Sequence, residues 1–166
     1  VIWSHVRAGK SQQVAIGRVL YELGKNPNLR VGVVSSIAKN AIKITRLIGS
    51  YIETSEPLHR LFPRLQHESR VWSAQAFTVK REPFIKGPSV QAVGQGSSIQ
   101  GDRIDLWVID DILNWDNTRT ALLRENMIEW AGSSLMSRLE PGTGRVWSIG
   151  NAFHPDDLLH HWAKQD

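Results

Sequence analysis

The chain has 166 residues, which is enough for one domain with a substantial hydrophobic core. Its hydrophobic content of 41% and charged content of 22% are ordinary for a globular protein and exclude a disordered tail, and the absence of cysteine excludes disulfides and thiolate metal sites. The formal net charge of +4 permits a polyanionic partner, whereas no apolar run approaches the ~20 residues that a membrane span requires.

The first third of the chain predicts alternating strands and helices. Residues 1–3 form a short apolar, strand-like run, and residues 10–23 carry apolar side chains at helical spacing. Residues 30–35 are apolar and rich in β-branched side chains, as in a strand that is buried on both faces of a parallel sheet. Residues 37–52 repeat isoleucine and alanine at helical spacing. This order is the beginning of a βαβ fold.

Residues 4–11, between the first strand and the first helix, partly match the phosphate-binding pattern G-x-x-x-x-G-K-[ST], known as Walker A. The match is at Gly9, Lys10 and Ser11, with Ser4 in the place of the first glycine. In such a loop, backbone N–H groups surround the phosphates, the lysine reaches the β- and γ-phosphates and the hydroxyl binds Mg²⁺. The expected nucleotide-binding residues are Ser4, His5, Val6, Arg7, Ala8, Gly9, Lys10 and Ser11. The alternative is a Gly-Lys-Ser turn without special purpose.

The middle of the chain has weaker signals. Residues 55–70 predict a short helix without assigned function, and His59 and His67 are expected at the surface because they lack metal-ligand spacing. Residues 71–94 predict short strands joined by turns. The glycine- and serine-rich residues 94–101 form a loop that either connects two elements or contacts substrate, and the sequence leaves both interpretations open.

A second strong motif is the segment of residues 104–111, in which four consecutive apolar residues, 106–109, are followed by Asp110 and Asp111. In phosphate-loop ATPases a buried strand of this kind, called Walker B, delivers an aspartate to Mg²⁺ beside the nucleotide. Asp110 fits that place, and Asp111 is the candidate for orienting and polarising the attacking water. The alternative is a strand that ends in a solvated turn.

The last third predicts a helix over residues 118–136, a turn at 140–144, a strand at 145–150 and a helix that starts near residue 154, with Pro155 in its first turn. Three tryptophans in predicted strands are expected in the core: Trp3, Trp107 and Trp147.

Residues 154–162 contain three histidines and two aspartates, which invite comparison with a metal site. His160 and His161 are adjacent and face different directions, and no pair of histidines lies four residues apart. Asp156 and Asp157 are instead expected to stabilise the start of the helix through capping and the helix dipole.

Three blocks of the chain resemble the ATPase domain of the large terminase subunits of tailed bacteriophages, which package DNA. These blocks are SHVRAGKS, GSSIQGDRIDLWVIDDI and VWSIGNAFHPDDLLHHW, in family order. The resemblance implies an α/β phosphate-loop NTPase of the RecA-like kind, a three-layer sandwich with a mainly parallel central sheet. It further implies that residues 1–166 are a single ATPase domain, expected to be an excised piece without the upstream adenine-binding segment and the C-terminal nuclease domain.

The resemblance also implies roles for single residues. Lys10 and Ser11 would bind phosphate and Mg²⁺, and Arg7 would stabilise the γ-phosphate during its transfer. Asp110 would be the metal-side carboxylate and Asp111 the catalytic one, where the family more often has glutamate. The motif that couples hydrolysis to movement on DNA would consist of Ser148, Gly150 and Asn151.

The expected function is therefore Mg²⁺-dependent ATP hydrolysis that powers the packaging of double-stranded DNA into a procapsid, in the host cell cytoplasm. The expected partners are double-stranded DNA, the portal protein, the small terminase subunit and further copies of the chain in a ring, with no membrane. Two alternatives stay open: a related nucleic-acid translocase or helicase, and a non-catalytic DNA-binding module that keeps the fold.

Overall fold

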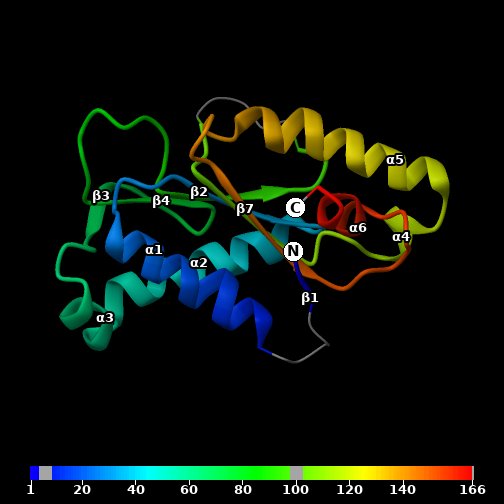
Figure 1. The fold of residues 1–166 in the computed structure, drawn as a ribbon. Coiled ribbons are helices and arrows are strands. Elements are labelled where there is room, and N and C mark those ends of the chain that lie inside the picture. The colour runs from blue at the N-terminus through cyan, green and yellow to red at the C-terminus, as the bar shows by residue number, and fades with distance from the viewer. Residues whose placement is uncertain (4–8, 98–102, 166) are drawn as a thin grey trace.

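The computed structural model describes residues 1–3, 9–97 and 103–165, which form a mixed seven-stranded sheet with helices on both faces (Figure 1). The strands are β1 (Ile2–Trp3), β2 (Val31–Ser35), β3 (His67–Trp72), β4 (Ala76–Val79), β5 (Val90–Gly94), β6 (Leu106–Asp110) and β7 (Arg145–Gly150). The helical segments are η1 (Ser11–Arg18), α1 (Val19–Lys25), α2 (Ala38–Thr54), α3 (Glu56–Leu61), α4 (Trp115–Thr118), α5 (Ala121–Trp130), η2 (Ala131–Leu135), η3 (Met136–Arg138) and α6 (Leu158–Ala163). The α/β class with a mainly parallel sheet is therefore confirmed.

The order of strands across the sheet is β1-β7-β6-β2-β5-β4-β3. The first five strands in this order run parallel, whereas β4 and β3 are antiparallel to their neighbours. All five residues of β2 and all five of β6 are buried, as expected for central strands covered on both faces. The carboxyl ends of β2, β6 and β7 consequently meet at one edge of the sheet.

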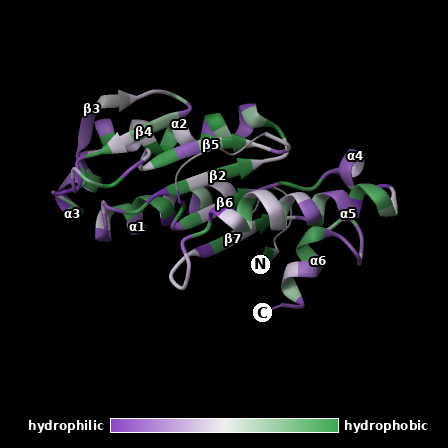
Figure 2. Ribbon diagram, turned by 90° about the horizontal axis from the view of Figure 1, so that it is seen from above, coloured by the Kyte–Doolittle hydropathy of each residue, from purple (hydrophilic) through white to green (hydrophobic). Residues whose placement is uncertain are grey.

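Two hydrophobic cores lie on the two faces of the sheet. On one face η1, α1 and α2 pack against the strands, and on the other face α5, η2 and α6 do so (Figures 1 and 2). The second core includes Trp107, whose ring lies over Gly32 of the neighbouring strand, where a Cβ would come within 2.0 Å of the ring. The indole Nε1 donates a hydrogen bond to the Leu135 carbonyl oxygen at 2.9 Å. Gly32 is therefore required by close packing.

The helix predicted over residues 118–136 is confirmed as a continuous helical run through α5, η2 and η3, residues 121–138, but its start lies three residues later than predicted. α4 ends at Thr118, and α5 begins at Ala121 after Thr120, whose side chain accepts a hydrogen bond from the backbone N–H of Leu123. An N-cap residue in extended conformation starts a new helix and cannot continue the preceding one.

Two further expectations for the ends of the chain are wrong. Trp3 is 51% exposed because β1 lies at the edge of the sheet and pairs only with β7 among the described strands, whereas Trp107 is buried and Trp147 half-buried. Pro155 lies before the last helix, since Asp157 occupies the N-cap of α6. Asp157 is fully buried and accepts hydrogen bonds from the N–H groups of Phe153, His154 and His160, so the expected capping role is confirmed for this residue.

Candidate functional site

The candidate site lies where the carboxyl end of β6 meets the start of the first helix. β6 delivers Asp110 at its last position, and Asp110 is only 6% exposed. Ser11 is the first residue of η1, and its hydroxyl lies 2.9 Å from each of the two carboxylate oxygens of Asp110. The fold thus brings together two oxygen-bearing side chains that are 99 residues apart in the sequence.

The environment of Asp110 raises the pKa of its carboxyl group. Burial is the main cause, because it disfavours the charged form, and the neighbouring carboxylate of Asp111 adds to it. The hydrogen bond from Ser11 and the charge of Lys10 act in the opposite direction without cancelling the shift. A positive charge placed beside Asp110 would relieve this unfavourable burial.

Lys10 and Asp111 form an ion pair directly beside the contact between Ser11 and Asp110. The Lys10 Nζ lies 3.0 Å from Asp111 Oδ1, and the lysine side chain is 9% exposed while that of the aspartate is 50% exposed. The ammonium group makes no well-oriented hydrogen bond to any described residue, so Asp111 is its charge partner in this part of the chain. A buried ammonium that keeps unused donors is suited to bind an anion.

The backbone of Asp111 is in the left-handed region, with φ of 46°, and Asp111 is the only non-glycine residue with positive φ in the described ranges. Aspartate tolerates this conformation better than most residues, yet it is strained. Two hydrogen bonds hold it: the Asp111 N–H donates to the Ile149 carbonyl at 2.9 Å, and the Asp111 carbonyl accepts from the Ser36 N–H at 3.4 Å. Such strain occurs preferentially at functional sites.

The residues of the predicted coupling motif lie at the same edge of the sheet. Ser148 pairs in register with Ile109, one residue before the carboxylates. A Cβ on Gly150 would lie 3.7 Å from Asp111 Oδ1, so this glycine borders the second carboxylate. Asn151 follows β7 directly and is half-buried. The structure therefore places Gly150 beside Asp111 and Ser148 and Asn151 at the same edge of the sheet, while their coupling role stays a prediction.

Ser35, at the carboxyl end of β2, was not singled out in the sequence. Its hydroxyl and that of Ser148 are both buried without a hydrogen-bond partner among the described residues, and both strands end at the edge that carries the carboxylates. The sequence pattern that indicates Ser35 as a candidate is a serine in the last position of a buried apolar strand.

Other predicted site residues are placed only in part. Ser4, His5, Val6, Arg7 and Ala8 lie outside the described residues. Gly9 is described and has a positive φ of 74°, as expected of a turn that enters a helix. Lys10 occupies the N-cap of η1, and its side chain makes no hydrogen bond to the first backbone N–H groups of this helix.

Residues 94–101 are described only up to Ser97. At the start of this loop, the Gln95 side chain accepts a hydrogen bond from Asn117 of α4 at 3.0 Å, and the Gln95 N–H donates to the Ser35 carbonyl at 3.2 Å. These contacts anchor the start of the loop beside the site edge, and the choice between connector and substrate contact stays open.

The histidines do not form a metal centre in the described part of the chain, where no group of three or more His, Asp or Glu side chains could hold a metal ion. His160 stands 3.0 Å from the Asp157 carboxylate and contacts the Trp3 ring, with 5.0 Å between ring centroids. Burial raises the pKa of Asp157, but its hydrogen bonds with the backbone and with His160 outweigh burial and hold it below its ordinary range. These contacts are structural.

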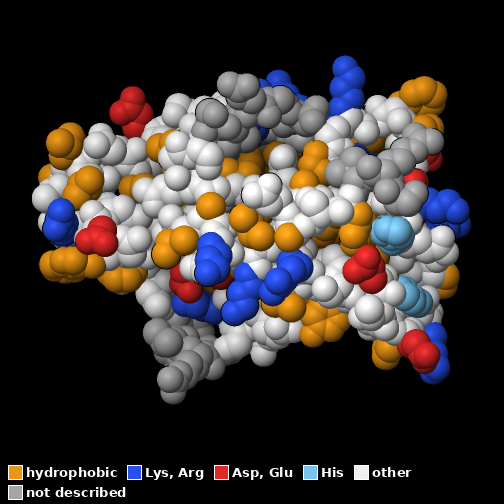
Figure 3. Space-filling model, turned by 180° about the vertical axis from the view of Figure 1, so that it is seen from behind, with side chains coloured by type: hydrophobic (Ala, Val, Ile, Leu, Met, Phe, Trp, Pro, Cys, Tyr) orange, Lys and Arg blue, Asp and Glu red, His pale blue; other side chains and the backbone are white. Residues whose placement is uncertain are grey.

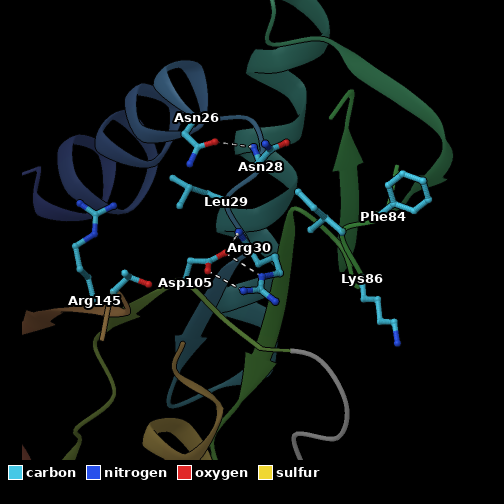
Figure 4. Close-up of a pocket in the computed structure, with 10 residues that line it drawn as sticks. Asn26, Asn28, Leu29, Arg30, Phe84, Lys86, Asp105 and Arg145 are labelled. Carbon is cyan, nitrogen blue, oxygen red and sulfur yellow. Dashed lines mark hydrogen bonds and ion pairs between the residues drawn. The ribbon is translucent and has the colours of Figure 1, made fainter. Parts of the chain in front are cut away.

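A pocket of about 560 Å³ lies at the opposite edge, where the parallel strands begin (Figure 4). Arg30, just before β2, donates hydrogen bonds of 2.7–2.9 Å to Asp105 and one of 2.7 Å to Glu140. Arg145, at the start of β7, pairs with Glu22 at 2.9 Å. These pairs tie the strand beginnings together at the edge of the sheet away from Asp110 and Asp111.

No protein-family model matches the chain, and no curated protein matches it. None of the helices in the described ranges is long and apolar enough to cross a membrane.

Proposed function

We propose that the chain is a Mg²⁺-dependent ATPase domain that drives the movement of double-stranded DNA, as the resemblance to large terminase subunits implies. The observation that carries this proposal is the contact between the Ser11 hydroxyl and both carboxylate oxygens of Asp110. It joins the serine of the phosphate-loop pattern to the first aspartate of the strand-end pattern, which is the pairing that a shared Mg²⁺ requires.

The donor set suits Mg²⁺, which prefers hard oxygen ligands. Ser11 and Asp110 would hold the ion, and the raised pKa of Asp110 reflects a buried negative charge that a cation would stabilise. When bound, Mg²⁺ neutralises charge on the phosphate oxygens of ATP.

The remaining side chains have separate tasks in this proposal. Lys10 donates from its buried ammonium to the β- and γ-phosphates, and the N-terminus of η1 adds backbone N–H donors. Asp111 accepts a hydrogen bond from the attacking water and orients it toward the γ-phosphorus. Arg7 would stabilise the negative charge of the transferred group.

The strand order supports a link between hydrolysis and movement. β7 lies between β1, which leads into the phosphate loop, and β6, which carries the two aspartates. Gly150, the last residue of β7, borders Asp111, so the proposed coupling residues can respond to a change there. The proposed partners of this domain, besides DNA, are the portal protein, the small terminase subunit and further copies of the chain in a ring. The proposed location is the host cytoplasm.

The direct test is release of inorganic phosphate from ATP by the parent chain and by Asp111→Asn, with and without Mg²⁺ and duplex DNA. We expect Mg²⁺-dependent release that DNA stimulates and that the variant lacks. Release that is equal in both proteins would contradict the role of Asp111. Absence of release in a folded parent that binds DNA would favour the non-catalytic module.

A further inference from the structure

The surface of α2 carries a stripe of basic side chains, defined here as Lys39, Lys43 and Arg46. The three residues are spaced by four and three positions, so they lie on one side of the helix, and all three are exposed. Figure 3 shows Lys and Arg side chains gathered over α2 on the face seen from behind. The opposite side of α2 is apolar and packs against β2 and β5.

The charges of this basic stripe are not compensated within the described part of the chain. None of its three cations makes an ion pair, a hydrogen bond or a ring contact there. Five cations elsewhere are paired with carboxylates, namely Lys10, Arg18, Arg30, Arg60 and Arg145, whereas some exposed cations outside α2, such as Lys86, Arg119 and Lys164, also make no ion pair with the described residues. α2 itself carries a single acidic residue, Glu53, near its far end. Uncompensated cations on one helix face favour a polyanionic partner.

We infer that the basic stripe of α2 contacts the phosphate backbone of double-stranded DNA. Seven residues of helix separate Lys39 from Arg46, a span of about 10.5 Å, which matches about three nucleotides of one strand at about 3.4 Å each. Lysine and arginine side chains supply many of the phosphate contacts in protein–DNA interfaces, and contacts to phosphate carry no sequence information. The contact is therefore independent of DNA sequence. This inference rests on the proposed function for the identity of the partner.

The position of α2 connects this surface to the candidate site. Ser36, two residues before α2, donates its N–H to the carbonyl of Asp111 at 3.4 Å. A change at Asp111 therefore has a short path to the helix that holds DNA. An anionic membrane is a poorer partner, because the apolar side of α2 is buried against the sheet and cannot insert into lipid.

The test compares the parent with the triple variant Lys39→Gln, Lys43→Gln, Arg46→Gln. A control variant removes the same charge elsewhere through Lys86→Gln, Arg119→Gln, Lys164→Gln, all exposed and outside α2. The probe is a fluorescent 30-base-pair duplex of mixed sequence, titrated by anisotropy at several NaCl concentrations. Circular dichroism verifies that each protein is folded, and calorimetry measures its Mg-ATP binding.

We expect the stripe variant to lose up to about 500-fold in DNA affinity at 0.1 M salt, with a salt slope smaller by about 2.7, which corresponds to three phosphate contacts. The control variant should reduce the slope by less than about one, and both variants should bind Mg-ATP like the parent.

An unchanged slope in the stripe variant, or equal losses in both variants, would overturn the inference. A parent that binds Mg-ATP but no duplex would overturn it while the ATPase proposal stands. A parent that binds DNA through the stripe but no Mg-ATP would instead contradict the ATPase. Stripe-dependent binding to phosphatidylserine vesicles without binding to the duplex would replace DNA by a membrane.

Discussion

The ion pair between Lys10 and Asp111 predicts that removal of the Asp111 charge strengthens nucleotide binding. Lys10 Nζ lies 3.0 Å from Asp111 Oδ1, so the lysine must exchange this partner when it binds phosphate. The carboxylate also repels a phosphate that approaches the same ammonium. Asp111→Asn removes both the ion pair with Lys10 and the repulsion of phosphate and keeps nearly the same side-chain volume. Under the proposed function we therefore expect the variant to bind ATP more tightly, although it would lose the proposed ability to orient the attacking water.

The size of the effect follows from the distance and the exposure. Two unit charges 3.0 Å apart attract by about 5.5 kcal/mol at an effective dielectric constant of 20 and by about 1.4 kcal/mol in water. Because Asp111 is half exposed, the lower value applies, and the ordering of two side chains offsets part of it. A net difference of about 1 kcal/mol corresponds to about fivefold in the dissociation constant.

The assay is calorimetric titration with ATP in EDTA, so that metal binding does not contribute. Asp116→Asn is the matched control, since it makes the same chemical change at an exposed position of α4, and we expect its affinity to stay within about twofold of the parent. Equal or weaker binding by folded Asp111→Asn would refute the view that Asp111 competes with the nucleotide for Lys10.

Three further outcomes can be measured. Ser11→Ala should remove the strengthening of ATP binding by Mg²⁺ but keep the affinity for ATP in EDTA within about twofold of the parent. The reason is that the variant loses the proposed metal ligand and no proposed phosphate contact, and calorimetry with and without Mg²⁺ measures both affinities. Asp157→Ala should lower the free energy of unfolding by about 2 kcal/mol in urea titrations, because buried N–H groups lose their acceptor. Since the pKa of Asp157 is lowered, this difference should be complete at neutral pH and decline as the pH falls from the ordinary aspartate range through the lowered pKa; a difference independent of pH would contradict the capping role. Gly32→Ala should destabilise by about 2 kcal/mol because its Cβ meets the Trp107 ring, whereas Gly132→Ala, with open space around it, should not destabilise.

The parts of the fold that depend on local pattern could be predicted from the sequence. The continuous apolar residues of β2 and β6 and the helical spacing of α2 each report a buried face directly. The division between α4 and α5 was also readable, because Thr120 before an apolar run is a typical N-cap signal.

Features that depend on strand order could not be predicted in this way. The exposure of Trp3 follows from the edge position of β1, and the contact of Ser11 with Asp110 follows from the crossovers that place β6 near η1. The sequence patterns indicated both halves of the candidate site, but nothing local specified that Lys10 would pair with Asp111. Nor did any local pattern indicate the left-handed backbone of Asp111, which hydrogen bonds with two distant segments hold in place.

The central claim is that Lys10 and Ser11 belong to a phosphate-binding loop that holds Mg-ATP. Its most direct test is calorimetric titration of the parent chain and of Lys10→Ala with Mg-ATP, with Lys164→Ala as a control for the loss of a lysine. We predict binding by the parent and by the control, and a loss of at least about 100-fold in Lys10→Ala, because a charge-assisted contact to two phosphates disappears. Equal binding by parent and Lys10→Ala, or no binding by the folded parent at millimolar ATP, would contradict the account.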